Sequence, residues 1–259
     1  SIAIDLRDPA GVEVARRLAA TCDVVIENFI PGGADRMGLG YDALRDGHPE
    51  LVYCSISGYP HDSPEAALPG FDFAIQAEGG IMSITGDVDG APMKVGVAIA
   101  DVTSGMFAAN GILAALYQRQ FTGRGQRIEV VMQEVVTNFC RISYAAEALG
   151  GKPALRNGNQ SVLGSTSPSE AYPCKGGGPN DYVYIYTSAA NPEHWTRLLK
   201  VMGREDLITD PRFIDNAART ANAKDIRDLV AAWAIQRDKK EVMKLVGDAG
   251  TPVGAVYDT

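Results

Sequence analysis

The sequence has few histidines and no paired cysteines, which limits the chemistry open to it. Only three histidines and four cysteines occur among 259 residues, all widely spaced and without a C-x-x-C pair. They are His48, His61 and His194, and Cys22, Cys54, Cys140 and Cys174. This pattern argues against a metal site, a disulfide framework and a Ser-His-Asp hydrolase. The simplest compartment for such a chain is the reducing cytoplasm.

Positive charge is also scarce. The chain has 24 basic against 32 acidic residues, a formal net charge of -8, which argues against a nucleic-acid partner or an anionic membrane surface. No apolar run reaches the length of a membrane span, so we expect no membrane partner. With 46% hydrophobic and 22% charged residues, the composition is that of a globular protein with one large or two ordinary domains.

The usual nucleotide-binding and hydrolase motifs are missing. The sequence has no G-x-G-x-x-G, no Walker loop, no G-x-S-x-G elbow and no H-E-x-x-H. It also begins without an initiator Met or a signal peptide, and both ends have strand-like residues. We therefore expect a chain that is truncated at both ends, with its chemistry carried by carboxylates and glycine turns.

Strands and helices alternate through the first half of the chain. Short apolar runs separated by helical periodicity predict a parallel sheet flanked by helices. The expected strands are residues 2–6, 24–26, 51–56 and 127–132. One helix is expected to begin at Asp8-Pro9, and two others to span residues 101–120 and 133–149. Residues 151–171 are rich in Gly, Ser, Pro and Asn and indicate a linker with a loop. Residues 172–259 predict a smaller α+β domain with three amphipathic helices.

Asp101 is the strongest single candidate for chemistry. It stands at the start of the long apolar helix, where an aspartate is favoured as an N-cap that binds free helix amides. The same amides and the helix dipole would stabilise an ionised carboxylate that acts as a nucleophile. Asp72, after Gly70-Phe71, has the same two interpretations. Spacing alone favours the N-cap for Asp101.

Other candidates follow the expected strands. Asn28 and Phe29 come directly after a buried strand, at the edge where open α/β sheets bind ligands, although an ordinary turn explains them equally well. Arg36 could bind a phosphate or lie on a solvated face. Residues 164–167 (GSTS) could form an active-site lid or a plain surface loop.

Taken together, these segments resemble the class III CoA-transferase (CaiB/BaiF) family. Each motif is weak alone, but five occur in the family's order and spacing, and the resemblance runs through essentially the whole chain. They are DVVIENFIPGGADRMGLGYDAL (23–44), LVYCSISGY (51–59), LPGFDFAIQAEGGIMSITG (68–86), KVGVAIADVTSG (94–105) and TGRGQRIEVVMQE (122–134). The chain is most similar to formyl-CoA transferases and related dicarboxylate CoA-transferases.

The resemblance implies a fold and partners. Residues 1–150 would form part of a large Rossmann-like CoA-binding domain, residues 151–171 a linker and active-site loop, and residues 172–259 the small domain. The family forms interlocked homodimers. It holds no permanent cofactor, and coenzyme A or acyl-CoA and a small carboxylic acid are its substrates.

The resemblance also assigns residues to the reaction. Asp101 would be the catalytic nucleophile, which forms an acyl-aspartyl anhydride and then an aspartyl-CoA thioester. Gly164, Ser165 and Thr166 match the loop that closes over these intermediates, although the family's glycine run is reduced here to one glycine. The remaining matches would contact CoA or the substrate: Asn28, Phe29, Arg36, Met37, Phe71, Asp72 and Met132.

Phe71 separates transferases from their racemase relatives. The α-methylacyl-CoA racemases of the same family carry a histidine in a G-H-D segment, where this chain has Gly70-Phe71-Asp72. A phenylalanine cannot shuttle a proton. We therefore expect a CoA-transferase, with a racemase or isomerase activity, or an inactive CoA-binding fragment, as the alternatives.

Overall fold

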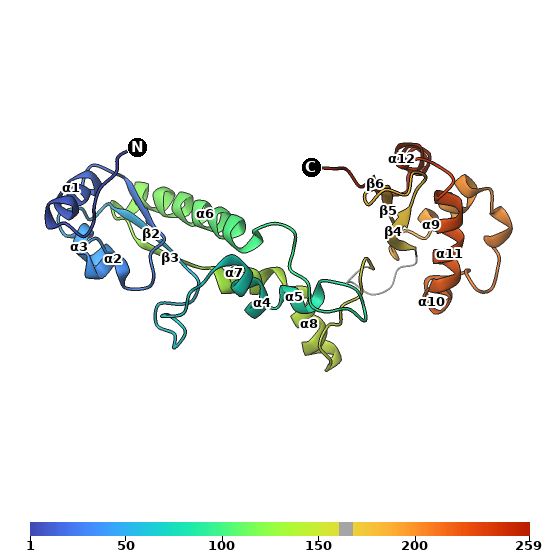
Figure 1. Cartoon of the computed structure of the whole chain (residues 1–259), viewed down its shortest axis with the longest axis horizontal. Coiled ribbons are helices and arrows are strands. Elements are labelled where there is room, and N and C mark those ends of the chain that lie inside the picture. The colour runs from blue at the N-terminus through green and yellow to red at the C-terminus, as the bar shows by residue number, and fades with distance from the viewer. Residues whose placement is uncertain (161–167) are drawn as a thin grey trace. The chain divides into compact units, whose positions relative to one another are not determined.

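The protein forms two compact units, described here by a computed structural model (Figure 1). The structure describes residues 1–160 and 168–259. The first unit is Ser1–Arg156 and the second is Asn157–Thr259. The domain boundaries expected from the sequence stay a prediction for the whole protein.

A parallel three-stranded sheet organises the first unit. Its strands are β1 (Val24–Glu27), β2 (Val52–Ser57) and β3 (Arg127–Val131), in the order β1-β2-β3. Ile26 pairs with Cys54, and Ser55 pairs with Glu129, so the carboxyl ends of all three strands lie at one edge. The predicted α/β class with a parallel sheet is confirmed.

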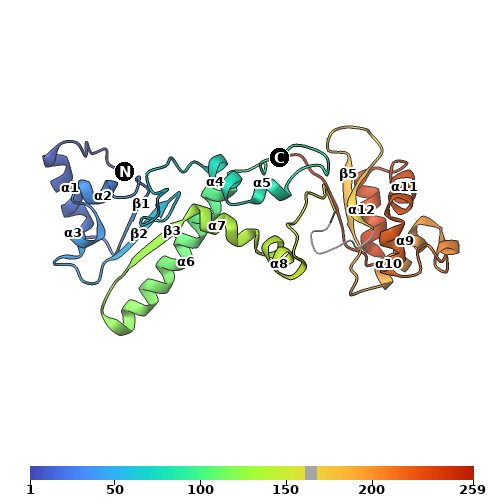
Figure 2. The same ribbon diagram turned by 90° about the horizontal axis from the view of Figure 1, so that it is seen from below.

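The central strand explains why the sequence folds this way. Both faces of β2 are covered, and five of its six residues are buried, which suits its continuous VYCSIS run. The helix α6 (Ile99–Thr122) packs against β2 and β3, as Figure 2 shows, and contributes Ala108 to a core with Cys54 and Val130. The sheet edge that carries the candidate site is therefore fixed by a packed layer.

Shorter helices complete the first unit. The predicted start at Asp8-Pro9 is confirmed: α1 (Pro9–Ala19) begins at Pro9, and the Asp8 side chain accepts a hydrogen bond from the amide of Ala10. The others are α2 (Gly33–Arg36), α3 (Tyr41–Arg45), α4 (Asp72–Glu78), α5 (Ile81–Ile84), α7 (Met132–Phe139) and α8 (Arg141–Gly150).

Two expected secondary-structure elements of this unit are wrong. Residues 2–6 form no strand, because an extended segment becomes a strand only when it pairs with a neighbour, and these residues pair with none of the described strands. The single helix expected over 133–149 is divided at Cys140, whose backbone (φ -83°, ψ 5°) leaves the helical region. No Gly or Pro precedes Gly150 there to signal the break.

α6 is also long and apolar enough to cross a membrane, judged by length and composition. By this measure the expectation that no apolar segment reaches a membrane span is wrong. A single helix of this kind is weak evidence, because core helices pass the same test. Only 28% of its most apolar window is buried inside the described structure, yet one side of it packs against β2, β3, α4 and α7.

The second unit is an antiparallel sheet covered by helices. The strands β4 (Ser169–Pro173), β5 (Tyr182–Tyr186) and β6 (Val253–Ala255) are ordered β4-β5-β6. One continuous core joins them to the helices and includes Trp195, Leu198 and Ile226. The helical segments are α9 (Glu193–Met202), the 3-10 turn η1 (Glu205–Leu207), α10 (Asn216–Ala221), α11 (Ala223–Ala234) and α12 (Lys239–Asp248). The smaller α+β fold is thus confirmed, with α10 and η1 added to the three predicted helices.

Candidate active site

A pocket of about 390 Å³ opens at the carboxyl edge of the parallel sheet. The segments that follow β1 and β3 and the end of β2 all contribute to it, as expected for a ligand site in an open α/β sheet. Five of the residues predicted from sequence line it together. The lining residues are Asn28, Phe29, Ile30, Pro31, Ser57, Gly58, Leu68, Pro69, Gly70, Phe71, Asp101 and Met132.

Asp101 lies in the first turn of α6, and it is not the N-cap of that helix. The helix begins at Ile99, and the N-cap position is Ala98, which has no side chain able to cap. The favoured interpretation of Asp101 as an N-cap is therefore wrong. The side chain of Asp101 therefore does not cap α6, and it lies in the pocket wall.

The cap of α6 comes from a different helix. Oδ1 of Asp72, the first residue of α4, accepts hydrogen bonds from the amides of Ala100 (2.7 Å) and Asp101 (3.1 Å). These amides have no partner inside their own helix, so the buried carboxylate of Asp72 satisfies them from outside. Asp72 does not cap its own helix either, since Phe71 occupies the N-cap position of α4.

Gln76 extends this arrangement and was not identified as a site residue from the sequence. Its fully buried amide group donates to Asp72 Oδ2 (2.6 Å) and to the Val97 carbonyl (3.2 Å), and it accepts from the Val95 amide (2.9 Å). Gln76 thereby ties the segment that precedes Asp101 to α4. The signal was present as D-x-x-x-Q, which puts both side chains on one helix face.

Burial and Asp72 both act on the carboxyl of Asp101. Asp101 is exposed to the pocket, yet the protein around its carboxyl desolvates it enough to raise its pKa above the ordinary aspartate value, and the negative charge of Asp72 raises the pKa further. A carboxylate that is poorly stabilised by its surroundings gains more from forming a covalent bond to an electrophile. The site therefore positions the backbone of Asp101 tightly while leaving its charge less stabilised.

Two glycines shape the floor of the pocket by letting two backbones touch. A Cβ atom on Gly58 would lie 2.5 Å from the Cα atom of Gly70, and a Cβ atom on Gly70 would clash with Gly58 in return. Both residues therefore need to be glycine for the end of β2 to meet the segment that leads to Phe71. Ser57 and Phe71, the neighbours of these glycines in the sequence, line the same pocket.

The residues that follow β1 have different roles in the pocket wall. The side-chain amide of Asn28 donates to the Ile56 carbonyl (2.7 Å), which links the turn after β1 to β2. Phe29 is 42% exposed, and Phe71 on the facing segment is 77% exposed. Both rings line the same pocket as Asp101 and give its wall an apolar character.

Three predicted residues do not line this pocket. Asp72 lies behind Asp101, as described above. Arg36 is exposed at the end of α2, where its guanidinium folds over the turn before it: a Cβ atom on Gly32 would lie 3.1 Å from Arg36 Nη1. Met37 is half-buried at the C-cap of the same helix. Their expected contacts with CoA stay predictions.

The predicted active-site loop, Gly164, Ser165 and Thr166, lies outside the described residues. Within the residues that the structure describes, no group of three or more His, Cys, Asp or Glu side chains could hold a metal ion.

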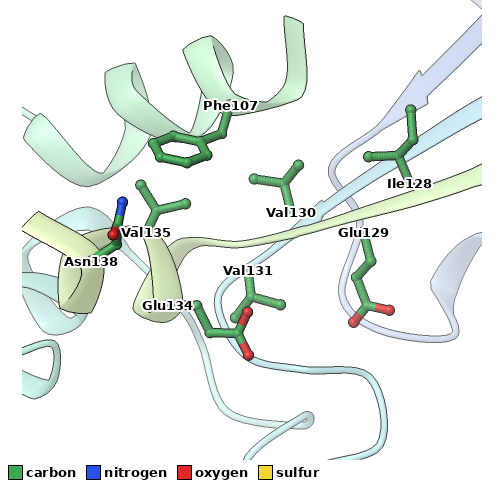
Figure 3. Close-up of a pocket in the computed structure, with 8 residues that line it drawn as sticks. All are labelled: Phe107, Ile128, Glu129, Val130, Val131, Glu134, Val135 and Asn138. Atoms are coloured by element: carbon green, nitrogen blue, oxygen red, sulfur yellow. The ribbon is translucent and has the colours of Figure 1, made fainter. Parts of the chain in front are cut away.

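A second hollow of about 320 Å³ lies along β3 and is lined by Phe107, Ile128, Glu129, Val130, Val131, Glu134, Val135 and Asn138 (Figure 3). Successive β3 side chains point to opposite sides of the strand there. Ile128 and Val130 lie on the side of Phe107, and Glu129 lies on the other. None of the residues predicted for the site lines this hollow.

Comparisons with known proteins place the chain in one family. The model of CoA-transferase family III matches residues 1–259. The formyl-CoA:oxalate CoA-transferase of Streptomyces avermitilis is 38% identical over 272 residues, which cover 100% of this chain and 65% of that protein. The succinate–glutarate CoA-transferase of Agrobacterium fabrum is 33% identical over 256 residues, covering 99% of this chain and 62% of that protein.

Comparison with solved structures points to the same family. A CaiB/BaiF family protein from Brucella suis superimposes with a TM-score of 0.86 at 34% identity, over 100% of this chain and 66% of that one. The chain thus spans slightly less than two thirds of the length of these relatives. From the match along its whole length, the chain belongs to CoA-transferase family III.

Proposed function

We propose that the protein containing this chain transfers CoA from an acyl-CoA to a carboxylic acid, with Asp101 as the nucleophile. One observation carries the proposal: the Asp101 carboxyl lies in a pocket at the carboxyl edge of the sheet while Asp72 takes over the capping of its helix. Family membership supports the same reaction class.

The proposed reaction exchanges acyl bonds without any net proton transfer. An Asp101 oxygen attacks the thioester carbonyl of the donor, the C–S bond breaks, and CoA thiolate leaves. The thiolate attacks the aspartyl carbonyl of the resulting anhydride, which releases the donor acid and leaves an aspartyl-CoA thioester. The acceptor carboxylate attacks that thioester, the C–S bond breaks, and CoA thiolate leaves a second anhydride behind. The thiolate then attacks the acceptor acyl carbonyl of this anhydride, which forms the new acyl-CoA and frees the Asp101 carboxylate.

The pocket wall suits this sequence of steps. Both intermediates hydrolyse if water reaches them, and the wall beside Asp101 includes the exposed apolar side chains of Phe29, Leu68 and Phe71. A bound acyl-CoA would cover these side chains and displace water from them. Proton transfer, which a racemase needs, has less support because no histidine is among the residues that line this pocket.

We propose a short dicarboxylic acid as the acceptor. The relatives named above pair acyl groups with oxalate or glutarate, both of which are dicarboxylates. CoA is used here as a substrate, and no permanent cofactor is needed for the proposed steps. A homodimer without a membrane partner, in the cytoplasm, stays the prediction for the whole protein.

The test is a trapping experiment on the whole protein. After incubation with formyl-CoA or succinyl-CoA and acid quenching, mass spectrometry should find the acyl or CoA adduct on the peptide that contains Asp101. Asp101→Ala should lose at least about 10³-fold in kcat, since it removes the covalent route. Asp89→Asn, at an exposed aspartate outside the pocket, is the matched control. Turnover by Asp101→Ala at the wild-type rate would overturn the mechanism.

A further inference from the structure

A chain of hydrogen bonds crosses the three parallel strands and ends on the pocket wall. It runs from Arg127 on β3 through His61 to Ser55 on β2, then to Glu27 on β1, and finally to the backbone amide of Phe29. Phe29 lines the pocket that holds Asp101, whereas the other four residues lie outside it.

The donor and the acceptor of each hydrogen bond in this series follow from the groups involved. The guanidinium of Arg127 can only donate, so His61 Nδ1, 2.9 Å from Arg127 Nη2, must accept and carry no proton. The ring proton is then on Nε2, which donates to Ser55 Oγ at 3.2 Å. The Ser55 hydroxyl donates to Glu27 Oε1.

The last bond reaches the pocket. Oε2 of the same Glu27 carboxylate accepts the amide proton of Phe29 at 2.8 Å. The carboxylate is therefore held on one oxygen by Ser55 and holds the turn after β1 with the other.

Strand register and burial hold this arrangement in place. Glu27 pairs with Ser55, and Ser55 with Glu129, in neighbouring parallel strands, so their side chains lie on the same face of the sheet. Ser55 is completely buried, and a buried hydroxyl without partners would be costly. Glu129 Oε1 also accepts the backbone amide of His61 at 2.9 Å, which fixes the loop that carries the imidazole.

We propose that His61, in its neutral form with the proton on Nε2, is a positioning residue for the Asn28–Phe29 turn and sets the affinity of the site for acyl-CoA. This inference rests on the proposed function for its ligand. His61 acts through Ser55 and Glu27 and does not touch the reacting atoms. Its loss should weaken binding of the acyl-CoA more than it slows the chemical steps.

Two substitutions at His61 test the hydrogen bonds of its two ring nitrogens separately. In His61→Gln the side-chain amide can reach the position of Nε2 and still donate to Ser55. In His61→Asn the carbonyl can reach the position of Nδ1 and still accept from Arg127, but the side chain is too short for Ser55. The matched control is His194→Asn in the second unit, since His194 is half-buried and hydrogen-bonded to Ser188 and Asn191.

The kinetic experiment uses the whole protein and acyl-CoA. We expect His61→Asn to raise the KM for acyl-CoA by about 3- to 10-fold, the equivalent of one net hydrogen bond, with kcat within about twofold. His61→Gln and His194→Asn should stay within about twofold of wild type. Equal losses in His61→Gln and His61→Asn, or no loss in either, would overturn the proposal.

A second measurement needs no CoA chemistry and so separates this inference from the proposed function. In the free protein, ¹⁵N NMR of the His61 ring should show the tautomer protonated on Nε2, and hydrogen exchange of the Phe29 amide should be at least about threefold faster in His61→Asn and in Ser55→Ala. A proton on Nδ1, or unchanged exchange at Phe29 in both variants, would overturn the inference even in an active transferase. If the protein lacks transferase activity while these two signatures hold, the proposed function fails and the positioning role of His61 stands.

Discussion

Asp72 has two opposing effects on Asp101. It holds the backbone of Asp101 through the amide hydrogen bond, and at the same time its charge adds to the burial that raises the pKa of the Asp101 carboxyl. For a nucleophile this combination is useful, since the group is held in place without being deactivated by strong stabilisation of its charge.

The pH dependence of the reaction should reveal the charge effect. In the proposed mechanism Asp101 attacks as a carboxylate, so kcat/KM should fall as the pH drops through the raised pKa of its carboxyl, above the usual aspartate range. Asp72→Asn removes the neighbouring charge, and the acid limb of the profile should move to lower pH. At pH 7 the variant should be about 10-fold slower, because the new side chain has a single acceptor oxygen and cannot bind both Gln76 and the α6 amides.

Thermal unfolding provides an independent check of the direction in which the pKa of Asp101 is shifted. A carboxyl whose pKa is higher in the folded than in the unfolded state binds more protons when folded, so its ionisation lowers stability as the pH rises through that interval. Asp101→Asn should therefore raise the melting temperature at pH 7, with the gain vanishing once the carboxyl of the wild type is protonated in both the folded and the unfolded state. A lower melting temperature for this variant at pH 7 would contradict the assigned shift.

At the scale of single residues, the sequence predicted which side chains meet more reliably than what they do. Asn28, Phe29, Phe71, Asp101 and Met132 line one pocket, as the family motifs implied. The capping role was assigned wrongly because it depends on which helix lies beside the start of α6. That neighbour is 29 residues away in the sequence, and local spacing carries no information about it.

Among the elements, the contact between the end of β2 and the segment before α4 leaves no room for a side chain on either backbone. The backbones of Gly58 and Gly70 touch, and a methyl group on either one has no space. Since this contact joins two walls of the pocket, its geometry decides how far Phe71 lies from β2.

Alanine at either glycine should disturb both folding and binding. We expect Gly58→Ala and Gly70→Ala each to lower the free energy of unfolding by about 2–3 kcal/mol, the usual cost of overpacking, and to raise the KM for acyl-CoA. The control is Gly254→Ala, since a Cβ atom there meets nothing within 4 Å. Chemical denaturation measures the first effect, and wild-type stability of both variants would show that the two segments can separate freely.

Element types were predicted well, and element ends less so. Helical periodicity located α6 within two residues of each end, because its long apolar pattern is strong. The division at Cys140 was missed, since no Gly or Pro within residues 133–149 marks it. The expected strand over residues 2–6 has the right residue types but no pairing partner among the described strands.

At the scale of the whole molecule, each unit has its own core. Among the residues that the structure describes, the second unit has one cluster of 15 buried residues around Trp195 and Ile226, and the first unit has three smaller clusters. A single continuous core is the mark of an independently folding domain.

Residues 157–259 should therefore fold when expressed alone. We expect a cooperative thermal transition and dispersed amide NMR signals, because the core is contained within these residues. Leu198→Ala in this fragment should lower the free energy of unfolding by about 2–5 kcal/mol, since Leu198 is fully buried there. A broad, non-cooperative transition for the fragment would mean that its core depends on the first unit.

The origin of the α6 cap has a consequence for protein design. A designer who grafts the α6 segment with its aspartate onto a new scaffold would leave the amides of Ala100 and Asp101 without an acceptor. The smallest portable module is α4 together with the stretch from Val95 to the first turn of α6, since Gln76 binds the backbone of that stretch. The position of Asp101, the proposed nucleophile, thus depends on a two-helix fragment that has to be copied whole.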